Sequence, residues 1–118
     1  CVVPRAEIPR FLREVKSFLS AQNLYSVMFG HAGDGNVHID ILKGDMDYGL
    51  WTELITKKKK GIYRRAIDLG GDITGEHGIG CLRKSYLPMS SAPEAIELAR
   101  RIKAAFDPLG ILNPDKIL

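Results

Sequence analysis

The sequence predicts an α+β fold in which a small antiparallel sheet carries its helices on one face. Two observations lead to this class. Apolar residues recur at helical spacing in separate stretches, and short runs rich in β-branched and aromatic residues lie between those stretches. Read along the chain, the stretches give the order βαββαβ, which is the ferredoxin-like pattern. C-terminal helices and an extended tail are expected to follow it.

The first part of the chain supplies these six elements. A length of 118 residues, of which 45% are apolar, is enough for a domain with a real core. The opening run is rich in β-branched residues and is interrupted by Pro4, and two later runs form a hairpin around the turn Ala32–Val37. Strands and helices are expected at residues 1–7, 8–22, 24–31, 37–43 and 48–69, and the stretch 70–80 is expected to give a short strand that enters a glycine-rich loop.

The division expected within the chain places a ferredoxin-like portion at about 1–76 and a helical portion at 77–118. A short helix is expected over 81–86. A longer helix follows it, with Ser91 and Glu94 as a capping box and Asp107-Pro108 as its end. Its apolar face consists of Ile96, Leu98, Ala99, Ile102, Ala105 and Phe106. The apolar, turn-rich tail is expected to pack against another surface.

The bulk composition argues against several classes of protein. The formal net charge is +3, and the excess lies in Lys57–Lys60 and Tyr63–Arg65 within one expected helix. Without interleaved aromatics or a known motif, this run predicts a solvated helix face and no nucleic-acid partner. No apolar run approaches the roughly 20 residues of a transmembrane segment. The two cysteines, Cys1 and Cys81, form no CxxC, which favours a reducing, cytoplasmic compartment, with any membrane association through partner subunits.

All three histidines fall in two glycine-rich stretches, "GHAGDGNVHID" and "GEHGIG". His31 and His38 are expected to face each other at the ends of the hairpin strands, where both imidazoles approach one point. With Glu76 they form a ligand set for a divalent ion such as zinc, manganese or iron, with positions open for a further ligand. His77 would then be available as a general base.

Other residues near these stretches have simpler interpretations. Gly33 and Gly35 are expected to allow positive φ and a close backbone approach, and Asp34 and Asn36 to stabilise the turn. Cys81 is expected to be a small buried residue.

The cations Arg83 and Lys84 follow the second glycine-rich stretch and are candidates for binding a substrate carboxylate. Neither glycine stretch fits a nucleotide-binding motif, and "EHGIG" lacks the second histidine of HExxH.

The motifs "GHAGDGNVH", "GEHGIGCLRK" and "FDPLGILNPDKIL" together resemble the C-terminal domain of FAD-linked oxidases. This group holds glycolate oxidase FAD subunits, D-lactate dehydrogenases and D-2-hydroxyglutarate dehydrogenase. The resemblance covers nearly the whole of residues 1–118 and implies a substrate domain, with FAD bound mainly by a separate N-terminal domain that this chain lacks. The opening at Cys1 rather than Met also leads us to expect a piece of a longer polypeptide.

By that resemblance the metal ligands are His31, His38 and Glu76, and His77 takes the hydroxyl proton of the substrate. The reaction implied is metal-assisted hydride transfer from a D-2-hydroxy acid, such as glycolate or D-lactate, to the flavin. Asn113 would lie close to the flavin. Asp40 stands where some members have an asparagine facing the substrate, so the identity of the hydroxy acid stays open.

A substrate domain of this kind is expected to depend on other domains and proteins. Alone, the chain is expected to be inactive, because nothing in it could accept a hydride. The surface that a flavin domain would cover is expected to favour self-association as a homo-oligomer, and an electron-transfer partner would reoxidise the flavin. Two alternatives remain at this point: a non-catalytic metal-binding module, and a subunit-contact domain whose histidines are incidental.

Overall fold

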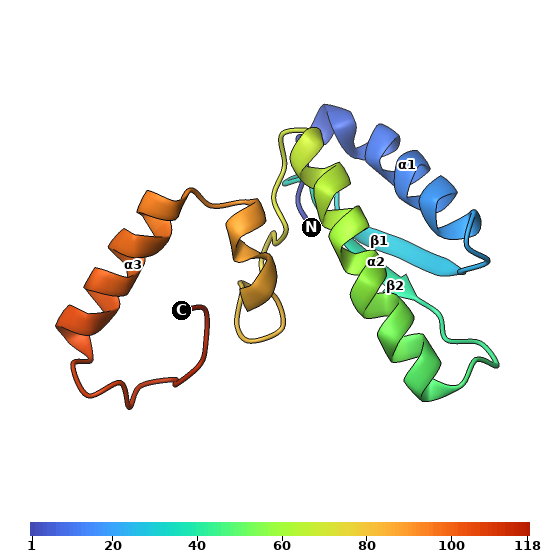
Figure 1. Ribbon diagram of the computed structural model, residues 1–118. Coiled ribbons are helices and arrows are strands. Elements are labelled where there is room, and N and C mark those ends of the chain that lie inside the picture. Colours follow the sequence, from blue (N-terminus) through green and yellow to red (C-terminus); the bar gives the residue numbers. More distant parts are fainter. The chain divides into compact units, whose positions relative to one another are not determined.

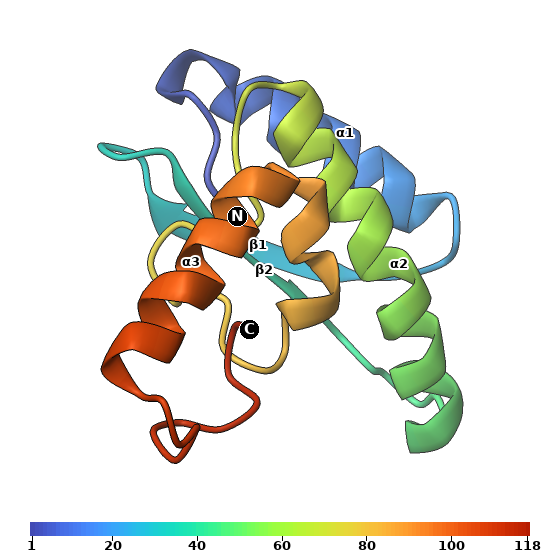
Figure 2. The same cartoon turned by 60° about the vertical axis from the view of Figure 1, so that its left-hand side comes forward.

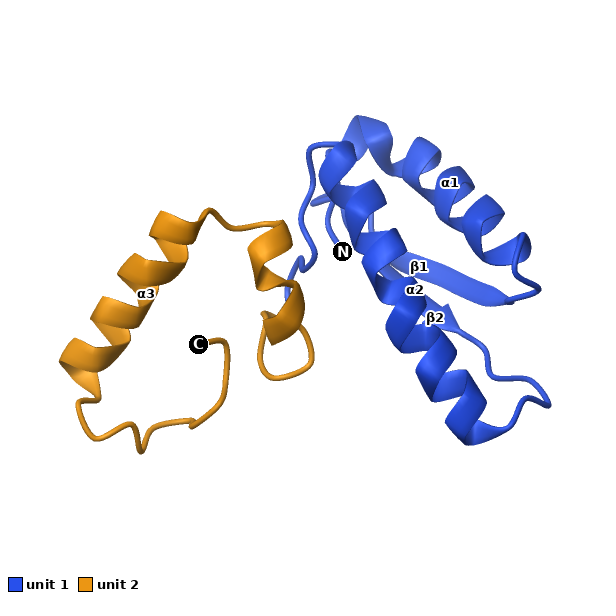
Figure 3. Ribbon diagram, in the orientation of Figure 1, with its two compact units in different colours: residues 1–76 blue, residues 77–118 orange.

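The computed structural model describes residues 1–118 and shows three α-helices and one β-hairpin (Figure 1). The elements are α1 (Ile8–Ser20), β1 (Ser26–His31), β2 (Asn36–Ile41), α2 (Tyr48–Asp68) and α3 (Pro93–Phe106), with 3₁₀ turns at Arg5–Glu7 and Lys84–Met89. The chain divides into two compact units, Cys1–Glu76 and His77–Leu118 (Figure 3), and each is described by itself.

The first unit confirms the α+β class, but the full four-stranded ferredoxin-like sheet is not confirmed. Only β1 and β2 pair as strands, in antiparallel orientation. The expected first and last strands are reduced to single bridges, in which Val2 pairs with Asn36 on one side and with Asp72 on the other. Pro4 has no N–H to continue a ladder, and a 3₁₀ turn begins at Arg5, so the first strand cannot extend further.

The register of the hairpin runs from Ser26 opposite Ile41 to His31 opposite Asn36. The turn therefore spans only 32–35 rather than reaching residue 37. Because side chains alternate along a strand, one face of the hairpin is apolar and packs into the core through Met28, Val37, Ile39 and Ile41. Helices α1 and α2 lie side by side over this face (Figures 1 and 2), and the other face points away from them.

The core of the first unit forms between these helices and the hairpin. Phe11, Val15 and Leu19, at helical spacing on α1, are fully buried, which confirms the amphipathic pattern. Side chains of this size each contribute about 1.5–3 kcal/mol when buried. On α2, Gly61 lets the Phe18 ring approach, since a Cβ there would lie 2.5 Å from Phe18 Cζ.

Helix α2 is well defined at both ends and carries the basic run. The Asp47 carboxylate accepts a hydrogen bond from Leu50 N at 3.1 Å at its start, and Gly70, just past its end, takes a φ of +79°. Lys57 is exposed and pairs with Glu53 one turn earlier, at 2.5 Å. None of the helices combines the length and the apolarity needed to cross a membrane.

The second unit departs from two expectations. The short helix predicted at 81–86 is instead a 3₁₀ turn over Lys84–Met89, which contains Pro88, a residue without the N–H that an α-helical hydrogen bond needs. The capping box was also wrong. The residue that caps α3 is Ala92 rather than Ser91, and no side chain caps the helix, although Pro93 occupies an allowed first position.

The C-terminal tail is held by Asp107, the residue that ends α3. Its side chain is buried, accepts hydrogen bonds from Ile111 N at 3.0 Å and Leu112 N at 2.9 Å, and forms an ion pair with Lys103. The ion pair with Lys103, and then the two backbone hydrogen bonds, hold the pKa of Asp107 below its usual value. In contrast, no residue of α3 is buried, so its apolar face stays open.

We expect the substitution Gly35→Ala to destabilise the chain by about 1–3 kcal/mol. Gly35 takes a φ of +78°, and a Cβ there would overlap the carbonyl oxygen of Val3. Gly33 is the matched control, because it has no such φ and nothing lies within 4 Å of its Cβ position, contrary to the expectation that both glycines are needed. Equal free energies of unfolding for the two variants, measured by urea denaturation, would contradict this account.

The pKa of Asp107 is expected to lie below the usual aspartate value of about 3.9. Because the folded pKa is lowered, the carboxylate stabilises the tail above the unfolded pKa, and this stabilisation is lost as the pH falls through the folded pKa. Carbon-detected NMR of the carboxyl group checks the value. The Lys103→Met variant should raise it, whereas Arg100→Met should leave it unchanged, and an Asp107 pKa at or above the usual value would refute the assignment.

Candidate metal centre

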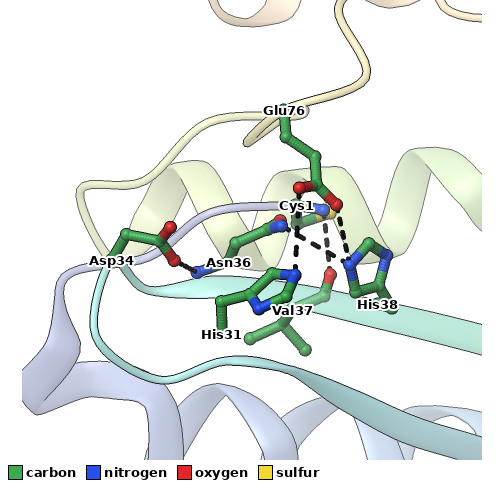
Figure 4. A network of polar contacts seen from close by, with 7 residues as sticks. All are labelled: Cys1, His31, Asp34, Asn36, Val37, His38 and Glu76. Atoms are coloured by element: carbon green, nitrogen blue, oxygen red, sulfur yellow. Dashed lines mark hydrogen bonds and ion pairs between the residues drawn. The ribbon is translucent and has the colours of Figure 1, made fainter.

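Three side chains that are distant in sequence converge on the outward face of the hairpin (Figure 4). His31 ends β1, His38 lies within β2, and Glu76 follows the Asp72 bridge. The His38 Nε2 lies 2.9 Å from Glu76 Oε1, and the His31 Nε2 lies 3.9 Å from Glu76 Oε2. One nitrogen or oxygen from each residue lies within 4.8 Å of the others, and all three residues belong to the first unit.

The hairpin places the two imidazoles differently from the expected arrangement. His31 faces Asn36 and His38 faces Phe29, so the histidines are diagonal neighbours and not a directly opposed pair. The cause is the short turn, which moves the register by two residues at the strand end. Diagonal neighbours on one face of a sheet still reach each other, and the two ring centroids lie 5.8 Å apart with the rings nearly perpendicular.

The His38 ring is held more firmly than the His31 ring. Phe29 stacks on His38 with ring centroids 5.1 Å apart and planes 22° apart. The side chain of His38 is 22% exposed, compared with 61% for His31. The role of Phe29 is not visible in the sequence, because it depends on the position of Phe29 opposite His38 in the register.

The loop that carries Glu76 lies directly on Asn36. This asparagine is buried, at 5% exposure, and its amide Nδ2 lies 3.5 Å from His38 Nε2. A Cβ added to Gly75 would overlap Asn36 Oδ1 and lie 2.9 Å from Asn36 Cγ, so only glycine allows this approach. In the turn itself, Asp34 Oδ1 accepts a hydrogen bond from Asn36 N at 3.2 Å, as the turn assignment predicts.

The donor set fits a divalent ion of the first transition row. Two imidazoles and a carboxylate are common ligands of zinc, manganese and iron. The ligand atoms of a tetrahedral zinc ion lie about 3.4 Å apart, which is closer than His31 Nε2 and Glu76 Oε2 at 3.9 Å. The His31 side chain, 61% exposed, would therefore have to turn inward when an ion binds. Structural zinc sites usually have four protein ligands, but this cluster has three, as catalytic sites do. Cys81 is exposed rather than buried and is not among them.

The remaining candidate residues are placed as follows. Asp40 is exposed, faces Val27 in the register, and lies on the same face as His38, two residues earlier. His77, exposed, is the first residue of the second unit, which also contains Arg83, Lys84 and Asn113. Arg83 Nη1 donates to Gly78 O at 3.2 Å, Lys84 Nζ donates to Leu118 O at 2.7 Å, and Asn113 is exposed with a φ of +47°.

Comparison with known proteins points to one family of oxidoreductases. The model of the family described as FAD linked oxidases, C-terminal domain, matches residues 1–117. The chain is 40% identical to the glycolate oxidase subunit GlcD of Bacillus subtilis, over 98% of this chain and 24% of that protein. It is also 40% identical to a D-lactate dehydrogenase of Anaerostipes hadrus, over 98% of this chain and 24% of that protein.

A third relative is a D-2-hydroxyglutarate dehydrogenase of Stutzerimonas stutzeri, 38% identical over 94% of this chain and 25% of that protein. The chain thus spans about a quarter of the length of the curated relatives it matches.

Proposed function

The chain belongs to the family of FAD-linked oxidase C-terminal domains, and we propose that it is the substrate domain of an enzyme that oxidises a D-2-hydroxy acid to the 2-oxo acid. The relatives named for glycolate, D-lactate and D-2-hydroxyglutarate share one chemical feature in these substrates, a hydroxyl group beside a carboxylate. FAD, bound by a preceding domain of the whole protein, would supply the hydride acceptor.

The observation that carries the proposal is the convergence of His31, His38 and Glu76 on one point. These residues would hold a divalent metal ion. Such an ion, when bound, polarises oxygen atoms coordinated to it and lowers the energy of a developing alkoxide. Three protein ligands are one fewer than a closed structural zinc site usually has. At least one coordination position would therefore be open to a substrate oxygen atom.

The other residues are proposed to bind the substrate and to move its proton. Arg83 and Lys84 pair with the substrate carboxylate, and Asp40 lies on the face that the substrate would contact. His77 takes the proton of the hydroxyl group. The substrate thereby loses one proton from oxygen and one hydride from the α-carbon, and the carbon–oxygen bond becomes a carbonyl. Asn113 is proposed to lie near the flavin.

The outward face of the hairpin supports a partner or ligand at this position. Beside the histidines it carries the exposed apolar side chains of Val27 and Phe29. Tyr25 and Leu42, just beyond the strand ends, are exposed as well. Large apolar side chains exposed together on one face are typical of an interaction or ligand site. We therefore propose that the substrate and the flavin-binding part of the whole protein cover this face.

Calorimetric titration of the 118-residue chain with zinc and with manganese tests the metal site. We expect one ion per chain, with binding lost in the His38→Ala and Glu76→Gln variants and weakened in His31→Ala, because each variant removes one of the three ligands. Asp68→Asn is the control, since Asp68 is an exposed carboxylate on α2 of the same unit and lies outside the cluster. Unchanged affinity in the His38→Ala variant would rule out the proposed ligand set.

Dye reduction by the full-length FAD-loaded protein tests the reaction. We expect activity with at least one of glycolate, D-lactate and D-2-hydroxyglutarate. Replacing the general base in the His77→Asn variant should lower kcat by about 100- to 10,000-fold, while FAD content stays the same. Lys60→Gln, on the exposed side of α2, serves as the control. If no 2-hydroxy acid in a broad panel reduces the dye, the proposed reaction is wrong.

A further inference from the structure

We propose that Asn36 is a positioning residue that, together with Gly75, sets the separation between His38 and Glu76. The inference rests on the metal site proposed above and adds to it, since neither Asn36 nor Gly75 is one of the three ligands. Its basis is a direct contact between the strand that carries one ligand and the loop that carries another.

The position of Asn36 is fixed from several directions. Its backbone forms a bridge with Val2, and its N–H donates to Asp34 Oδ1 at 3.2 Å. The residue is 5% exposed, although it lies at the end of a strand on the outward face. A buried amide in such a place normally has a structural or functional reason, because burying it without partners is costly.

The contact with Gly75 leaves no spare space. Gly75 has no Cβ, and one built there would overlap Asn36 Oδ1 and lie 2.9 Å from Cγ and 3.3 Å from Cβ of the same residue. The loop therefore rests on the asparagine side chain itself. Since Glu76 is the next residue, the thickness of the Asn36 amide determines how far the carboxylate stands from the strand.

On its other side the same amide reaches the imidazole. Asn36 Nδ2 lies 3.5 Å from His38 Nε2, the nitrogen that also lies 2.9 Å from Glu76 Oε1. Asn36 thus contacts a histidine ligand (Figure 4) and, through Gly75, the loop of the carboxylate ligand. With an ion bound, His38 Nε2 would be occupied by that ion, so the support that remains is the packing of Asn36 against the Glu76 loop. Outer residues that hold metal ligands in place typically change the metal affinity by about 10- to 100-fold when they are replaced.

A double-mutant cycle in the 118-residue chain tests this arrangement, with zinc affinity measured by calorimetry. We expect Gly75→Ala to weaken zinc binding by about 10- to 100-fold, because the added methyl group lifts Glu76 away from His38. Asn36→Ala should weaken it by about 10-fold through loss of the support. In the double variant the overlap with Oδ1 is removed, so its affinity should be better than that of Gly75→Ala alone.

Two controls separate positioning from general stability. Gly33→Ala adds the same methyl group where nothing lies within 4 Å. Ile62→Val weakens the core, at a residue 5% exposed on α2, and should lower the melting temperature without changing the zinc affinity. If Gly75→Ala binds zinc like the wild type, or if the effects of Asn36→Ala and Gly75→Ala simply add, the proposal is overturned.

A second measurement on the metal-free chain keeps the inference separate from the metal proposal. The ¹⁵N signals of the His38 ring report its contact with Glu76. We expect them to shift in Gly75→Ala and to return toward the wild-type values in the double variant. If the wild type fails to bind zinc, the proposed metal site is wrong, and the ¹⁵N signals then test the positioning role by themselves. Unchanged signals in Gly75→Ala would overturn the role of Asn36 and Gly75.

Discussion

The pairing of Val2 with two distant segments is the constraint on which the first unit depends. Its N–H donates to Asp72 O at 3.1 Å and its carbonyl accepts from Asp72 N at 2.9 Å, while the residues beside it, Cys1 and Val3, bond to Val37 and Gly35. The hairpin and the segment after α2 therefore flank the same short piece of chain. Gly71 makes this possible, since a Cβ there would overlap the carbonyl oxygen of Val2. This pairing holds the segment that leads to Glu76 beside the hairpin, and so brings Glu76 close to His38.

Much of the fold could be predicted because its signals are local. The periodic apolar residues of α1 and α2 mark helices whose observed ends differ from the expected ones by no more than two residues. The sheet was less predictable, because the length of a strand depends on partners elsewhere in the chain. Val2 pairs with Asn36 and with Asp72 in antiparallel bridges, as sheet residues do, but Pro4 prevents the first strand from extending these bridges into a ladder. The capping box failed for a local reason: Ala92 rather than Ser91 has the extended backbone that precedes α3, and alanine has no side-chain acceptor.

In the candidate site, too, some features could be predicted from the sequence and others could not. The histidine spacing and the glycine-rich stretches pointed to the three side chains that the structure brings together. The contacts that orient them were not visible in the sequence. Phe29 stacks on His38 only because the turn has four residues and not six, and Asn36 meets Gly75 only because Val2 brings the two segments together. Candidate ligands can be recognised from their side-chain types. The residues that hold those ligands in place depend on the strand register, which the sequence does not show directly.

The three candidate ligands come from positions far apart in the chain, and this has a consequence for folding. An ion held by His38 and Glu76 would close a loop of about 40 residues, and the unfolded chain has no comparable set of donors in one place. Metal would therefore bind the folded form and raise its stability by mass action, by about 2.7 kcal/mol at a free ion concentration a hundred times the Kd. The same atoms proposed to activate a substrate would then also act as a cross-link between the hairpin and the segment after α2.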